Sequence, residues 1–243
     1  MELQTVSIAP RFRGPARSGN GGYVCGLIGG KVDGTASVRL FAPPPLEAEL
    51  ALLSDADSVK LLHGEVLIGE ARGATLDLTP PAAPTLEQAT VAAAKYTGFQ
   101  HHPFPGCFVC GPQRDGGDGL HIFAGPLSTN PLGDAGIVAS PWHVHASLAV
   151  DGKIPDEILW SALDCPGAFA VMPDMRERAI VLGQLTARID KPVSVGQHCI
   201  VIGWPLARDG RKHFAGSAVF SEQGELIALA KAAWFEVEKG RFE

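Results

Sequence analysis

The stretch that decides the fold reads Gly19-Asn20-Gly21-Gly22-Tyr23-Val24-Cys25-Gly26-Leu27-Ile28-Gly29-Gly30. Asn20 is a residue type that caps the start of helices, and the apolar residues after it follow the spacing of a helical face. Each glycine costs a helix about 1 kcal/mol relative to alanine, but it lets another element approach the helix backbone closely. The sequence therefore predicts a buried helix over residues 20–30 that its surroundings stabilise.

Strand-like runs follow this helix over residues 36–41, 49–53, 58–62 and 65–76, with turn residues between them. A Pro/Ala-rich stretch over residues 79–84 then precedes a short predicted helix over residues 85–95, for which Thr85 is the expected cap. We predict a boundary between two halves in this region, with a first unit over residues 1–100 and a second over residues 101–243.

The second half repeats the order of a helix followed by strands. Its turn-rich start at residues 107–112 is followed by predicted strands at 120–123 and 137–140 and by a helix near residues 155–165. Pro155 suits a first turn, acids follow it at the positive end of the helix dipole, and Pro166 should end or kink this helix. Four strands are predicted over residues 179–189, 198–205, 213–220 and 226–237.

Composition restricts the class of protein. The 243 residues are 46% hydrophobic and 19% charged, with a formal net charge of −6, so the chain can bury a core and does not resemble a dedicated nucleic-acid binder. No run reaches the ~18 apolar residues of a membrane span, and the start lacks the apolar core of a signal peptide. An odd number of cysteines, 5, favours a reducing compartment, and we expect a cytoplasmic protein without membrane partners.

A buried helix wrapped by a long antiparallel sheet, twice over, describes an α+β tandem (double) hot-dog fold. Three stretches resemble acyl-CoA thioesterases of the hot-dog superfamily. They are residues 20–26, residues 107–112 with Gly119, Leu120 and Phe123, and Ala162-Leu163-Asp164 followed by Gly167. The resemblance implies hydrolysis of an acyl-CoA thioester without a metal or an organic cofactor.

Two departures from the family pattern concern the site. Asn20 stands where a histidine is common, and the helix after it carries no acid up to Gly30. The second half has Ile154-Pro155-Asp156 in place of the glycine pair, but it keeps the acid. The halves are thus complementary, and we expect at most one composite site per chain.

The resemblance makes Asp164 the catalytic acid of that site. Apolar neighbours would partly desolvate the carboxylate, which raises its pKa and suits a general base that activates water. The alternative is a carboxylate near a helix end that hydrogen-bonds loop amides before Pro166.

Asn20, Gly21 and Gly22 are the candidates for holding the oxyanion, because free amides at a helix start can approach a thioester carbonyl. The alternative for these glycines is close packing. Candidates for substrate contact are Tyr23 and Trp160, with Gln184 and Thr186, since family members often use an amide and a hydroxyl to assist the acid.

Cys107 and Cys110 form a CxxC, half of a zinc knuckle. A structural zinc needs four ligands, and the others would have to come from His101, His102 or His121. A redox pair and a tight turn of buried cysteines are the other interpretations. We predict no tightly bound zinc, because only two thiolates lie at ligand spacing.

Other metal-ligating and nucleophilic side chains carry weaker signals. His143 and His145 alternate along one segment without an evident third ligand, so we expect ordinary strand or loop histidines. Cys165 follows Asp164, yet no histidine is near it in sequence, and we expect a small buried residue rather than a nucleophile.

Three functions stay open at this point. They are an acyl-CoA thioesterase, a hot-dog hydratase or dehydratase of enoyl- or hydroxyacyl-CoA, and a non-catalytic acyl- or ligand-binding protein. The partner in each case is an acyl-CoA or a related small thioester. Long antiparallel sheets leave edges that a second copy of the chain could cover, so the oligomeric state stays open, with a homodimer as one alternative.

Overall fold

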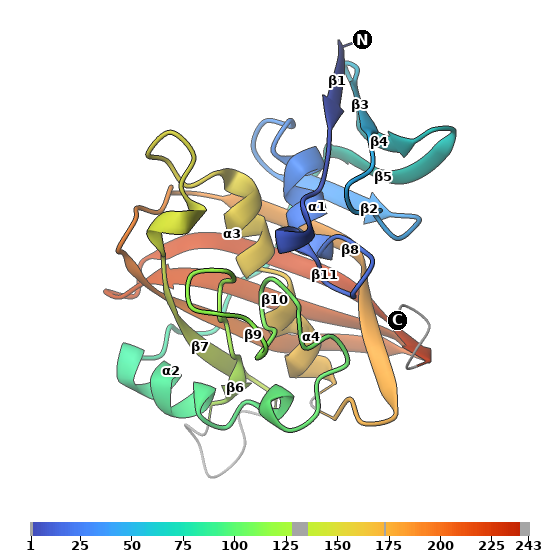
Figure 1. Ribbon diagram of the computed structural model, residues 1–243. Helices are drawn as coiled ribbons and strands as arrows, with labels where there is room; N and C mark the ends of the chain where they lie inside the picture. Colours follow the sequence, from blue (N-terminus) through green and yellow to red (C-terminus); the bar gives the residue numbers. More distant parts are fainter. Residues whose placement is uncertain (1, 128–135, 173, 239–243) are drawn as a thin grey trace.

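One antiparallel sheet runs through the computed structural model, which describes residues 2–127, 136–172 and 174–238 (Figure 1). Its eleven strands lie in the order β1-β3-β4-β5-β2-β8-β11-β10-β9-β7-β6. The bounds are β1 Glu2–Val6, β2 Ala36–Leu40, β3 Leu50–Ser54, β4 Val59–His63, β5 Val66–Gly73, β6 Gly125–Pro126, β7 Val138–His143, β8 Arg178–Ile189, β9 His198–Asp209, β10 Lys212–Ser221 and β11 Leu226–Glu238. The sheet joins its two parts where β2 pairs with β8.

Within the described ranges, four α-helices pack against this sheet or against one another. They are α1 Gly21–Gly29, α2 Leu86–Ala93, α3 Asp156–Ala162 and α4 Cys165–Val171, with short 3-10 turns η1 Pro10–Phe12, η2 Thr97–Phe99 and η3 Ala146–Leu148. α1 lies on β2, β5 and β8, whereas α4 lies on β9, β10 and β7, and α3 packs mainly on α1 (Figure 1). The predicted helix at residues 20–30 and the predicted strands of both halves are therefore confirmed, with one exception.

The exception is the strand expected at residues 120–123, which has no regular secondary structure. The amide of Leu120 donates to the carbonyl of Phe108 at 2.8 Å, and the amide of Ile122 donates to the carbonyl of Val109 at 2.9 Å. The alternating apolar residues are buried as a strand's would be, but they pair with the CxxC turn instead of the sheet. The prediction of a strand there is wrong because a turn satisfies the backbone donors.

The sequence did not predict β1, α4, the two-residue strand β6 or the three 3-10 turns. β1 pairs with β3 at the edge of the sheet, and its residues are mostly exposed, so it shows no hydrophobic alternation. α4 follows α3 after a break at Asp164. Pro166 does end the first helix, as expected, but it then occupies the first turn of a second one, where a missing amide is tolerated.

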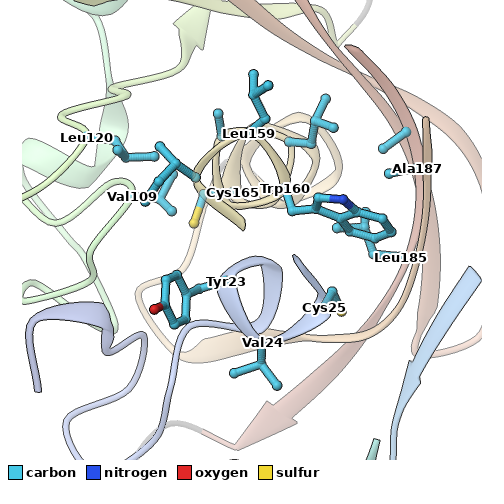
Figure 2. Packing of buried hydrophobic residues seen from close by; sticks show 14 of the residues in the cluster. Tyr23, Val24, Cys25, Val109, Leu120, Leu159, Trp160, Cys165, Leu185 and Ala187 are labelled. Carbon is cyan, nitrogen blue, oxygen red and sulfur yellow. The ribbon is translucent and has the colours of Figure 1, made fainter. Parts of the chain in front are cut away.

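The glycines of α1 let it contact α3 directly. A Cβ atom on Gly22 would lie 2.7 Å from the carbonyl oxygen of Trp160, and one on Gly26 would lie 2.4 Å from the Cα of Glu157. Figure 2 shows Trp160 of α3 beside this contact, its ring reaching toward Leu185 of β8. Close packing therefore explains Gly22 as well as Gly26.

The helix after the Pro/Ala-rich stretch packs with the later strands. α2 begins with a capping box between Thr85 and Gln88, and it contacts β7, β6 and β9. Its contacts among these elements are therefore with strands that follow it in the sequence. Among the described helices, none has the length and apolarity to cross a membrane.

Candidate functional site

Asp164 lies at the break between α3 and α4. Its backbone angles, φ −76° and ψ −84°, fall outside the helical region, and its side chain is buried, with the residue 2% exposed. The carbonyl of Leu163, which the break frees from α3, accepts a hydrogen bond from Ser217 Oγ at 2.6 Å. The break thus buries a carboxylate while the backbone around it stays hydrogen-bonded.

The start of α1 meets this carboxylate. Asp164 Oδ2 accepts hydrogen bonds from Asn20 Nδ2 at 2.8 Å and from the Gly22 amide at 2.9 Å. Asn20 Oδ1 accepts from the amide of Tyr23 at 2.9 Å, so one side chain both caps α1 and holds the acid. Asp164 Oδ1 is buried and has no partner among the described residues. The structure therefore brings Asn20 and Gly22 to Asp164, with one carboxylate oxygen free.

Burial determines the protonation of this group. Loss of water is the main reason that the pKa of Asp164 rises to about 7, and the nearby Cys107 acts in the same direction. The hydrogen bonds from Gly22 and Asn20 oppose that rise, because they stabilise the charged form. Both protonation states are thus accessible near neutral pH.

A cavity of about 540 Å³ opens onto the carboxylate, within the size range of small-molecule sites. Its polar lining includes Asn20, Gly21 and Asp164, and its apolar walls include Phe104, Phe169, Met175, Leu182 and Trp234. The indole nitrogen of Trp234 is buried without a hydrogen-bond partner in the described part of the chain. The lining of the cavity therefore combines apolar side chains with an acidic residue and the start of α1.

The two glycines of the expected oxyanion pair differ in position. The Gly22 amide already donates to Asp164, whereas Gly21, the first residue of α1, lines the cavity and its amide has no acceptor among the described residues. First-turn amides of a helix lack intrahelical partners. Gly21 is therefore the amide that a ligand could use, and Gly22 orients the carboxylate.

None of the expected substrate-contact residues lines this cavity. Tyr23 stacks on Phe12 with ring centroids 4.0 Å apart, and Trp160 packs on the glycines of α1. Gln184 and Thr186 donate to Ser37 Oγ at 3.0 and 2.8 Å, on the sheet face opposite the helices, because the alternate residues of β8 are buried in the core. The sequence does not reveal the register of β8, and this register decides which face of the sheet Gln184 and Thr186 occupy.

A cluster of three cysteines borders Asp164. The sulfurs of Cys107, Cys110 and Cys165 all lie within 4.8 Å of one another, and those of Cys107 and Cys165 are 3.7 Å apart. His102 Nε2 lies 3.3 Å from Cys110 Sγ. The premise that only two thiolates lie at ligand spacing is therefore wrong, because the break before α4 adds a third.

The three thiols shift one another's pKa values. Hydrogen bonds from Cys110 and Cys165 lower the pKa of the Cys107 thiol. Burial raises the pKa of Cys110, and the bond to Cys107 raises the pKa of Cys165.

Within the described residues, the other histidines considered as metal ligands do not join the cysteine cluster. His101 is exposed, and His121 lies 3.0 Å from the carbonyl oxygen of Asp115. His143 packs on His198 at a centroid distance of 4.9 Å, whereas His145 accepts from the amide of Ser147 at 3.1 Å. They diverge, as expected for ordinary strand and loop histidines.

Sequence reasoning missed the walls of the cavity. Phe104, Phe169, Met175 and Trp234 come from four separate segments, and an apolar residue that lines a cavity looks the same in sequence as one that fills a core. They come together only in the folded chain, where loops, α4 and β11 meet.

Comparison with known proteins identifies the fold of the chain. No family model and no curated protein matches the chain. Among solved structures, the tesB protein of Mycobacterium avium subspecies paratuberculosis is similar at TM-score 0.63 and 11% identity, covering 97% of this chain and 93% of that one. The acyl-CoA thioesterase II TesB2 of Mycobacterium marinum is similar at TM-score 0.62 and 11% identity, covering 98% and 94%. A hot-dog protein of unknown function from Alicyclobacillus acidocaldarius is similar at TM-score 0.57 and 9% identity, covering 97% and 93%. Similarity over nearly the whole of each chain, together with the large antiparallel sheet and its few helices, means that this chain has the hot-dog fold.

Proposed function

We propose that the chain is a tandem hot-dog thioesterase that hydrolyses an acyl-CoA thioester at one composite site around Asp164. In this proposal, β1–β5 wrap α1 in the first half, and β6–β11 wrap the α3–α4 pair in the second. The packing of α1 on β2 and β5 and of α4 on β9 and β10 supports the division.

The observation that carries the function is the free oxygen of Asp164. Its partner oxygen is held by Asn20 and Gly22, so the carboxylate cannot rotate without losing two hydrogen bonds. Oδ1 has no partner among the described residues, and Asp164 lines the cavity together with Asn20 and Gly21. In this proposal a water molecule binds Oδ1 at that polar end of the cavity. An acyl chain would lie along the walls formed by Phe169 and Leu182, with its carbonyl at that polar end.

The chemistry follows from these positions. Asp164 Oδ1 takes a proton from water as the water oxygen bonds to the thioester carbon, and the carbonyl oxygen becomes an oxyanion. The Gly21 amide donates to that oxyanion. When the C=O bond re-forms, the C–S bond breaks, and the proton on Asp164 passes to the departing CoA sulfur. The products are a carboxylic acid and free CoA.

A panel of acyl-CoAs tests this proposal. We expect release of free thiol that depends on acyl chain length, because the cavity volume limits the chain it can take. Enoyl-CoA absorbance followed in parallel separates hydrolysis from hydration. No thiol release and no absorbance change, with saturable binding of acyl-CoA, would instead favour a non-catalytic binding protein.

Two further expectations accompany this function. The hydratase alternative normally needs an Asp/His pair, and His102, the histidine beside the cysteine cluster, contacts Cys110 and the Phe104 amide. A homodimer stays a prediction, since β1 and β6 end the sheet among the described strands.

A further inference from the structure

We propose that Cys107, Cys110 and Cys165 bind one zinc ion through their three sulfurs, with the fourth zinc position facing the cavity. This site is distinct from the acid of the proposed function and does not depend on it.

The spacing of the sulfurs fits a single tetrahedral ion. Zinc binds thiolate sulfur at about 2.3 Å, which separates two sulfurs on one tetrahedral ion by roughly 3.8 Å. Cys107 Sγ and Cys165 Sγ are 3.7 Å apart, and Cys110 Sγ completes a triangle whose sides are all within 4.8 Å. All three cysteines are buried, and all three line the cavity.

The turn that carries two of the sulfurs is built for close approach. A Cβ on Gly111 would lie 2.5 Å from both the Cys107 nitrogen and the Pro105 carbonyl oxygen, so only glycine fits after the second cysteine. The Gly111 amide donates to the Cys107 carbonyl at 2.9 Å, and Tyr96 Oη donates to the Cys110 carbonyl at 3.0 Å. These bonds fix the backbone of both cysteines before any metal binds.

Two donors face the sulfurs and would stabilise thiolates. His102 Nδ1 accepts from the Phe104 amide at 2.9 Å, so the neutral ring carries its proton on Nε2, 3.3 Å from Cys110 Sγ. Asn20 Nδ2 lies 3.9 Å from Cys107 Sγ. His102 is therefore a donor to a sulfur ligand rather than a ligand itself, and the protein supplies three ligands.

Three protein ligands and an open fourth position define an exchangeable site. Zinc sites with three protein ligands take water or another small ligand in the fourth position. The three cysteines line the cavity, and the proposal directs the fourth position toward it. Each thiol that binds gives up its proton to solvent, so zinc binding releases protons and tightens as the pH rises.

Metal analysis of the full chain tests the proposal. Protein produced with zinc and purified without chelators should hold about one zinc per chain. After zinc removal, Co²⁺ should give the intense visible bands and the sulfur-to-cobalt charge-transfer band of a tetrahedral thiolate complex, and zinc should bleach both. Wild-type protein that gives neither zinc nor these cobalt bands would overturn the proposal, as would a disulfide within the cluster in the unreduced chain.

Variants separate the ligands from their surroundings. Cys165→Ser should abolish the cobalt bands, although it leaves the CxxC intact, and His102→Gln should weaken binding by about 10–100-fold without abolishing it. Cys199→Ser is the matched control, because Cys199 is a buried cysteine outside the cluster. Unchanged cobalt bands in Cys165→Ser would contradict the proposal. If that variant fails to fold, zinc protection of the three cysteines from alkylation, mapped by mass spectrometry in the wild type, decides the question.

Discussion

Replacing Asp164 by asparagine separates catalysis from structure at this site. The amide oxygen of the introduced side chain can accept the same two hydrogen bonds that Asp164 Oδ2 accepts from Asn20 Nδ2 and the Gly22 amide, at 2.8 and 2.9 Å. Its NH₂ group then takes the place of Oδ1, the oxygen without a partner in the described part of the chain. The variant keeps the packing of α1 on α3 but has no group that can take a proton from water.

The two effects differ in size. Loss of a positioned general base lowers the rate by about 10²–10⁴, which corresponds to roughly 3–5 kcal/mol in the barrier. Two hydrogen bonds that become neutral lose about 1 kcal/mol of stability or less, and the removal of a buried charge offsets part of that loss. We therefore expect kcat to collapse while the melting temperature stays close to that of the wild type.

The assay measures thiol release from the best acyl-CoA of the panel alongside thermal unfolding. Asp156→Asn is the matched control, since Asp156 is an exposed acid in the first turn of α3, and it should keep wild-type turnover. A folded Asp164→Asn variant that still hydrolyses thioesters at the wild-type rate would remove Asp164 from the mechanism. Lost stability with retained kcat per folded molecule would make the carboxylate a structural group.

Three further changes test the packing, the cavity and the charges. Gly22→Ala should destabilise the chain by about 1–3 kcal/mol in urea unfolding, because its methyl group would meet a backbone oxygen of α3 at 2.7 Å; Gly73→Ala, with open space around it, should change little. Leu182→Trp should fill the cavity and shift the preference toward shorter acyl chains, seen as a raised KM for long ones; an unchanged chain-length profile would place the acyl chain elsewhere. Glu236 accepts a hydrogen bond from His213, with Arg208 and Arg178 also beside it, and its pKa is lowered in the folded state. Its contribution is therefore present above pH 4.5 and lost as the pH falls through the lowered pKa, and His213→Gln should reduce that acid sensitivity of the melting temperature.

The predictable part of the fold is the part encoded by local pattern. The cap at Asn20 and the glycine spacing predicted α1 within a residue of its observed start, and alternation with turn residues predicted the long strands β8–β11. Long, periodic segments carry this signal because each buries one face. β1 has no such periodic pattern, because this exposed edge strand buries neither face.

The less predictable part depends on contacts between distant segments. Asn20 and Asp164 could be proposed as partners only through the family resemblance, since they are separated by 144 positions. The third sulfur, Cys165, is 58 positions from Cys107, so ligand spacing in sequence could not reveal it. Gln184 and Thr186 were assigned to the site because their residue types suit it, but the register of β8 points them to the other face.

The break between α3 and α4 at Asp164 determines the position of both candidate sites. If α3 continued through Asp164 as one helix, the carboxylate and the next residue's sulfur would point in directions about 100° apart around the helix axis, set by 3.6 residues per turn. The break gives Asp164 non-helical angles, and Pro166 prevents the amide ladder from continuing through it. Asp164 then faces the start of α1, and Cys165 faces the CxxC turn. Asn20 touches both groups, with one amide nitrogen 2.8 Å from the carboxylate and 3.9 Å from the Cys107 sulfur. A zinc ion on the sulfurs would thus fix the CxxC turn to the residue that follows the acid, and would hold the acid against α1.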